Sequence, residues 1–243
     1  MGVDQAIPPL AKFGSIPSVV VSLDGRVLTG GAVPAIFPGP QVMPIVERQL
    51  TARGWARIVA VARDAGLLGE RSSFGETMPG QEILRLQIVA DGRAYDLTAP
   101  NTAIPCVGEP CHGAPGTREA FMFMVSQLND LESWLFSDIG KQGPSRPEGY
   151  AIIVGAVPDD HGLPRLFVDW PFPDGFGAFG KPFADDSGFR CGALHGWDAM
   201  TFFSLLKAAN QMTTWRDPVD GSFHGLTVQP LLPGDGDPCA GMV

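Results

Sequence analysis

The sequence has few lysines and no cluster of basic residues. Of its 243 residues only four are lysines, no two Lys or Arg residues are adjacent, and the formal net charge is −9. A nucleic-acid backbone or an anionic membrane surface is bound by several convergent cations. The composition therefore argues against nucleic acid and against an anionic membrane surface as partners.

Long apolar runs are absent as well. A membrane-spanning helix needs about 20 consecutive, mostly apolar residues, and no run approaches this length. We therefore expect no membrane span in the given chain. Its first residues also lack the basic segment followed by an apolar segment that is typical of a signal peptide, although a mature exported chain would lack that segment too.

Motifs for covalent catalysis and for phosphate binding are missing. No Gly-x-Ser-x-Gly elbow occurs, and the segment 66–69 lacks the glycine spacing and the lysine of a phosphate-binding loop. The carboxylate pairs Asp159/Asp160 and Asp185/Asp186 lie in Gly/Pro-rich loops, where solvated turn residues are more common than acid or base catalysts. The catalytic residues therefore stay unassigned, and the sequence favours a protein that is not an enzyme.

The cysteines indicate a compartment. The chain contains Cys106, Cys111, Cys191 and Cys239, together with 31 glycines and 23 prolines. An even number of cysteines with few lysines favours an oxidising environment, where disulfides persist. We therefore expect export, and the alternative is four buried or incidental free thiols.

The apolar pattern predicts an α+β fold in which antiparallel hairpins pack with about three amphipathic helices. Hairpins are predicted at 19–28 and 83–97, each with an Asp-Gly pair at its turn, because a tight hairpin turn requires positive φ. Helices are predicted from Thr51 and from Thr117, two N-cap residues that precede apolar residues at helical spacing. The second of these is predicted to continue through Leu135, and a third helix covers 197–212.

The domain organisation follows from composition. Residues 1–17 contain prolines and little periodicity, which predicts a flexible tail, and residues 18–239 are predicted to form a single α+β domain. The Gly/Pro-rich segment 140–149 is the one sizeable candidate linker inside it. It gives two candidate sub-lobes, residues 18–139 and 150–239.

The sharpest local motif is Cys-x4-Cys-His at Cys106, Cys111 and His112. It predicts a short disulfide between Cys106 and Cys111. The alternative is an expanded haem c attachment site, in which two thiols bond the haem and His112 ligates the iron, so that the protein would be an electron carrier. Because the ordinary haem c spacing is two residues, we predict no cofactor.

Histidines are scarce: the chain contains His112, His161, His195 and His224. None has the paired ligand spacing of a structural zinc site, so no metal site is predicted. An alternative function remains open, in which an extracellular hydrolase-like enzyme uses His195 or His161 with a loop aspartate as acid and base.

Aromatic residues gather in a Gly/Pro-rich loop. The candidate contact loop comprises Trp170, Phe172, Phe176, Phe179 and Phe183. Rings at this density either fill the core or form an exposed apolar patch, and exposed patches mark contacts with partners. The loop is therefore a candidate surface for another envelope or extracellular protein, or for a second copy of the chain, and core filling is the alternative.

Short motifs in the last third of the chain follow one another in a fixed order. They are Trp170-Pro171, Arg190-Cys191, Trp197-Asp198-Ala199, Thr214-Trp215, Pro230-Leu231-Leu232-Pro233 and Cys239. This succession resembles the C-terminal pattern of an uncharacterised family of bacterial secreted proteins and lipoproteins. The N-terminal half fits the same family through the segments 23–27, 50–67, 90–92 and 128–131. The chain departs from the pattern at 106–111, an apparent insertion, and at 234–237.

The resemblance implies a bacterial protein that is secreted or lies at the cell surface. It also implies a disulfide between Cys191 and Cys239, and it implies no activity. Together with the missing catalytic motifs, it leads us to expect an exported, non-enzymatic module of the envelope or extracellular space that binds a protein or a small ligand.

Overall fold

In a computed structural model of the chain, the structure describes residues 19–33, 35–76, 78, 81–101, 113–159, 162–183 and 187–240. Cys106, Cys111, His112 and His161 lie outside these ranges, as does the predicted tail. The short disulfide and the haem alternative therefore remain predictions.

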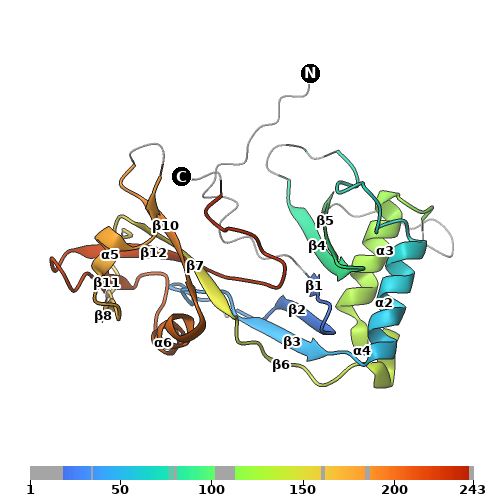
Figure 1. Cartoon of the computed structure of the whole chain (residues 1–243), viewed down its shortest axis with the longest axis horizontal. Helices are drawn as coiled ribbons and strands as arrows, with labels where there is room; N and C mark the ends of the chain where they lie inside the picture. Colours follow the sequence, from blue (N-terminus) through green and yellow to red (C-terminus); the bar gives the residue numbers. More distant parts are fainter. Residues whose placement is uncertain are drawn as a thin grey trace. The chain divides into compact units, whose positions relative to one another are not determined.

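The chain divides into two compact units. Of the described residues, those within 32–44 and 146–240 belong to unit 1, and those within 19–31 and 45–145 belong to unit 2. Each unit contains one six-stranded sheet (Figure 1). Every strand therefore finds its partners inside its own unit.

The sheet of unit 2 has the strand order β5-β4-β1-β2-β3-β6. Its strands are β1 Val19–Val21, β2 Arg26–Gly30, β3 Ile45–Gln49, β4 Ile83–Ala90, β5 Arg93–Pro100 and β6 Gly143–Pro144. β1 pairs in antiparallel fashion with β2 and in parallel fashion with β4. The turn between β4 and β5 uses Asp91 and Gly92, both at positive φ, as predicted for this hairpin.

Three helices accompany this sheet: α2 (Ala52–Asp64), α3 (Arg118–Asn129) and α4 (Leu131–Leu135). Thr51 and Thr117 cap α2 and α3, because their hydroxyls accept backbone N–H groups left unpaired in the first turn. The apolar stripes of both helices are buried in one core with β1 and β4, and Figure 1 shows the two helices side by side. The predicted continuous helix through Leu135 is interrupted at Asp130, whose backbone is not helical.

The sheet of unit 1 has the strand order β8-β11-β12-β7-β10-β9. Its strands are β7 Gly149–Gly155, β8 Phe167–Asp169, β9 Lys181–Pro182, β10 Arg190–His195, β11 Thr214–Arg216 and β12 Phe223–Pro230. The helices are α5 (Gly175–Ala178) and α6 (Gly196–Leu206), so α6 is shorter than the predicted helix over 197–212. In the described part of the chain, no helix has the length and apolar character that a membrane span requires.

The predicted α+β fold with three packed helices is wrong. The described residues are mostly β, with two mixed sheets of six strands each and five short helices that make up 24% of them. Strands of two or three residues, such as β6 and β9, are too short to show an alternating pattern, and they exist because a longer strand pairs with them. The parallel pairings β1/β4 and β8/β11 make the sheets mixed, which no hairpin signal announces.

The expected disulfide between Cys191 and Cys239 is present. The two Cα atoms lie 5.7 Å apart and both residues are buried. The bond joins β10 to the C-terminal segment across a sequence separation of 48 residues. A crosslink over this length restricts the unfolded chain far more than it restricts the folded one.

Replacing both cysteines by serine (Cys191→Ser/Cys239→Ser) should lower the free energy of unfolding by about 4 kcal/mol, the loop-closure value for this separation. Urea denaturation of oxidised protein measures the loss. In a Cys106→Ser/Cys111→Ser background, reduction of the Cys191–Cys239 disulfide with dithiothreitol should lower the free energy of unfolding by a similar amount. An unchanged urea midpoint after reduction in that background would show that the bond does not stabilise the fold.

Asp138 connects the start of α2 to a short 3₁₀ helix, η1 (Phe136–Asp138). Its carboxylate accepts hydrogen bonds from Arg53 Nε at 2.8 Å and from the Thr51 hydroxyl at 3.0 Å. These hydrogen bonds, that from Arg53 above all, lower the pKa of Asp138 below its ordinary value. The backbone is close here as well, because a Cβ at Gly54 would lie 2.5 Å from the Asp138 carbonyl oxygen.

Because the pKa of Asp138 is lowered on folding, its contribution to stability is present above the unfolded pKa and is lost as the pH falls through the folded pKa. Wild type should therefore be more stable than Asp138→Asn at about pH 5, and the difference should shrink toward about pH 2. Urea midpoints across this range measure it. Asp64→Asn, at an exposed carboxylate of α2, serves as the control, and a difference that does not change with pH would contradict the assignment.

Candidate functional site

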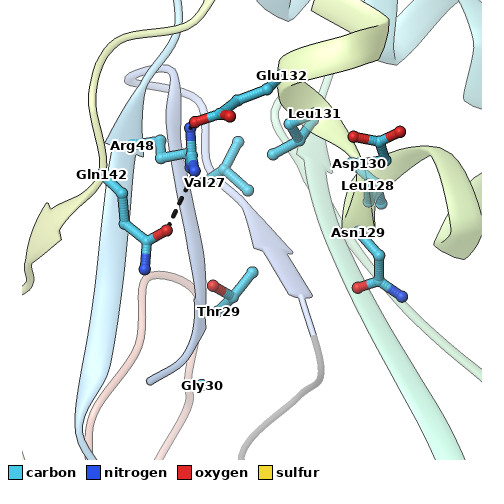
Figure 2. A pocket seen from close by; sticks show the side chains of 10 residues that line it. All are labelled: Val27, Thr29, Gly30, Arg48, Leu128, Asn129, Asp130, Leu131, Glu132 and Gln142. Carbon is cyan, nitrogen blue, oxygen red and sulfur yellow. Dashed lines mark hydrogen bonds and ion pairs between the residues drawn. The ribbon is translucent and has the colours of Figure 1, made fainter. Parts of the chain in front are cut away.

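A polar cleft with a volume of about 310 Å³ lies in unit 2 (Figure 2). Its floor belongs to β2 and β3, one wall is the junction of α3 with α4, and Gln142 closes the opposite side. A small, concave, partly apolar site with a few convergent polar groups is the usual form of a ligand site.

The register of the sheet explains why the floor is polar. Ile88, Val21, Val27 and Arg48 stand opposite one another on successive strands and therefore share a face. The first three are buried beneath the helices, whereas Arg48 is partly exposed. The row thus changes from apolar to polar where the helical layer ends.

The neighbouring row repeats the change. Leu86 and Val19 are fully buried, and the residue that continues the row on β2 is Thr29, which is only half-buried. This row is apolar again on β3, where Val46 pairs with Thr29. The hydrogen-bonding groups on this face are therefore Thr29 on β2 and Arg48 on β3, beside the apolar core.

Arg48 is held from two sides. Its Nη1 donates to Glu132 Oε1 at 2.8 Å, and its Nη2 donates to Gln142 Oε1 at 3.1 Å. Figure 2 shows Glu132 reaching from the helical wall to Arg48, and Gln142 turning its amide oxygen toward the guanidinium group. A guanidinium group has five N–H donors. Three of them remain without a partner among the described residues.

The helical wall presents Asn129 and Asp130 between the apolar residues Leu128 and Leu131. The Asp130 side chain makes no capping hydrogen bond to α4. Its carboxylate is therefore available to a ligand. With Glu132, the cleft carries two carboxylates and one guanidinium group, and none of the residues that line it is His, Cys, Ser or Lys. This set can hold a ligand by charge and by hydrogen bonds.

Sequence reasoning did not identify this cleft. Its residues come from four separate segments, 27–30, 48, 128–132 and 142. The segment 128–131 is one of those that fit the resembled family, but that resemblance implied no site. Nothing in the spacing of the four segments indicated that they would meet.

The predicted contact loop lies in the core of unit 1. Trp170, Phe176 and Phe183 are buried, and Phe172 and Phe179 pack against them as partly buried rings. The Trp170 ring has its centroid 4.6 Å from that of Phe176 and 5.0 Å from that of Phe172. The loop therefore fills the core, which was the alternative, and offers little of these rings to a partner.

Among the described residues, no acid–base site forms around His195, and His161 lies outside them. His195 is exposed and flanks the start of α6, and no described carboxylate forms a hydrogen bond or ion pair with its ring. A different pair is close, because Ser222 Oγ lies 2.8 Å from His224 Nε2. This contact was missed, although Asp-Gly-Ser-Phe-His at a turn was visible in the sequence.

The Ser222–His224 contact belongs to a turn network. Asp220 accepts from the Ser222 backbone N–H at 2.8 Å, and hydrogen bonds from Ser222, its hydroxyl first, lower the pKa of Asp220. In a catalytic triad the carboxylate orients the imidazole, whereas here it contacts the serine. The arrangement therefore stabilises the turn before β12.

Metal ligands do not converge within the described ranges, where no group of three or more His, Cys, Asp or Glu side chains is placed to hold an ion. Comparison of the chain with protein-family models, with curated proteins and with solved structures found no match. The geometry of the cleft therefore carries the functional argument.

Phe176→Ala should destabilise the protein by about 3–5 kcal/mol, because it empties a buried ring position. Phe167→Ala is the matched control, since Phe167 is 60% exposed and only its contact with Phe223 is lost. Its cost should stay below about 1 kcal/mol. Urea denaturation measures both values. If both substitutions lowered the stability by equal, small amounts, the Phe176 ring would not be part of the core.

Proposed function

We propose that the protein is an exported, non-enzymatic binding module whose unit 2 cleft holds a small polar ligand. The observation that carries this proposal is the cleft itself, in which Arg48, Thr29 and Asp130 line one small volume. Apolar side chains of β2 and of the helical wall share this lining. Small-molecule sites combine such an apolar lining with a few polar groups that fix the ligand's orientation.

The state of Arg48 supports binding over a purely structural role. Exposed ion pairs contribute about 0–1 kcal/mol to stability, and Glu132 is 73% exposed. Stability alone therefore gives little reason to place an arginine on this face of the sheet. Holding the guanidinium group in one orientation, with donors left over, is what recognition of a ligand requires.

Export is supported by two features. The buried disulfide between Cys191 and Cys239 is the kind of bond that persists in oxidising compartments. The C-terminal motifs resemble those of an uncharacterised family of bacterial secreted proteins and lipoproteins.

Thr29 allows a direct test of the cleft. It lines the cleft, it is only half-buried, and as the second residue after Val27 on β2 it shares the face of the sheet that carries Val27 and Arg48. Thr29→Phe should therefore obstruct the cleft and leave the fold intact, because aromatic residues suit strands. Thr98→Phe, at a half-buried threonine of β5 that does not line the cleft, is the matched control in the same sheet.

Ligand-observed NMR with sugars, polyols, amino acids, organic acids and amines should identify at least one class that binds wild type. Binding should be lost in Thr29→Phe and retained in Thr98→Phe, while the urea midpoints of both variants stay near that of wild type. The proposal fails if none of these classes binds, or if a binder is held equally well by Thr29→Phe.

A further inference from the structure

We infer that the ligand of the cleft is a small zwitterion of the amino-acid type, with its carboxylate on Arg48 and its ammonium group against Asp130. This inference rests on the proposed function. It follows from which hydrogen-bonding groups the protein has already used and which it has left for a ligand.

The guanidinium group selects the first group of the ligand. Glu132 and Gln142 each take one N–H of Arg48, which leaves three N–H donors without a partner among the described residues. A carboxylate fits paired guanidinium donors in geometry, and this fit selects it, since Glu132 already compensates the charge of Arg48. Because Arg48 is fixed from two sides, little side-chain entropy is lost when such a group binds.

The net charge of the cleft selects the second group. One guanidinium group and two carboxylates give a sum of −1, and Glu132 already compensates Arg48 through their 2.8 Å ion pair. Asp130 is then the uncompensated charge on the opposite wall, and its side chain has no capping role. A ligand that carried only a carboxylate would leave this charge unmatched, whereas an ammonium group pairs with it.

The size and lining of the cleft agree with this class. About 310 Å³ is at the small end of ligand sites. No aromatic ring lines the cleft. A quaternary ammonium ligand, which aromatic rings recognise, is therefore disfavoured. Asn129 and Thr29 remain to accept or donate hydrogen bonds along the body of the ligand.

A homologous series of probes tests the inference on the full chain. Glycine, β-alanine, 4-aminobutanoate and 5-aminopentanoate carry the same two charged groups at increasing separation. Calorimetric titration should show binding that peaks within the series. The acid and the amine that match the best member, each lacking one charged group, should bind at least about tenfold more weakly.

Two variants assign the groups. Arg48→Lys keeps the positive charge and removes the paired N–H donors of the guanidinium group, so it should lower the affinity for the zwitterion by about tenfold or more. Asp130→Asn should lower the affinity for the zwitterion. The affinity for the matched acid should stay unchanged or rise, a difference in sign that a merely structural residue would not produce. Arg63→Lys and Asp91→Asn, from an exposed ion pair elsewhere in unit 2, are the controls and should change neither.

The outcomes separate the two levels of the proposal. If sugars, polyols or amines bind in a manner that Thr29→Phe abolishes while the zwitterions do not, the cleft is a ligand site and the zwitterion inference is wrong. If the zwitterions bind equally well to Thr29→Phe, they bind elsewhere and the inference is also overturned. If no probe of any class binds, the proposed function fails with it.

Discussion

The width of the unit 2 sheet relative to its helical layer is the constraint on which the cleft depends. Strands lie about 4.8 Å apart and a helix is about 10 Å wide, so two helices cover about four strands of a six-stranded sheet. α2 and α3 bury β1 and β4, and the cover ends at β2. Thr29 and Arg48 lie at this boundary, where apolar residues alone would leave an exposed apolar surface.

The break of the helix at Asp130 completes the site. A continuous helix would keep its apolar stripe on the core, whereas the non-helical backbone at Asp130 starts a new helix in which Glu132 reaches Arg48. The ion pair is too exposed to add much stability. Its effect is geometric, since it joins the helical wall to the sheet and holds the guanidinium group in one place.

Unit 1 contains a Gly/Pro-rich loop that cannot form long regular elements. Aromatic rings around Trp170 and Trp215 fill its core, and the buried Asp217 accepts the backbone N–H of Phe176 at 2.6 Å and that of Val219 at 2.7 Å. One carboxylate thus satisfies two backbone donors of irregular segments, as burial requires. The loop is built for packing, and this removes it as the partner surface that its composition indicated.

The sequence by itself determined the local elements of this protein: the Asp-Gly turn of the β4/β5 hairpin, the helix starts at Thr51 and Thr117, and the cysteines that favour disulfide formation. Each depends on neighbouring residues only. The fold class, the shortest strands and the cleft were decided by tertiary structure, because they arise from pairing between distant segments. Arg48 meets Glu132 and Gln142 only after β3 has taken its register beside β2 and β6, and no spacing along the chain encodes that meeting.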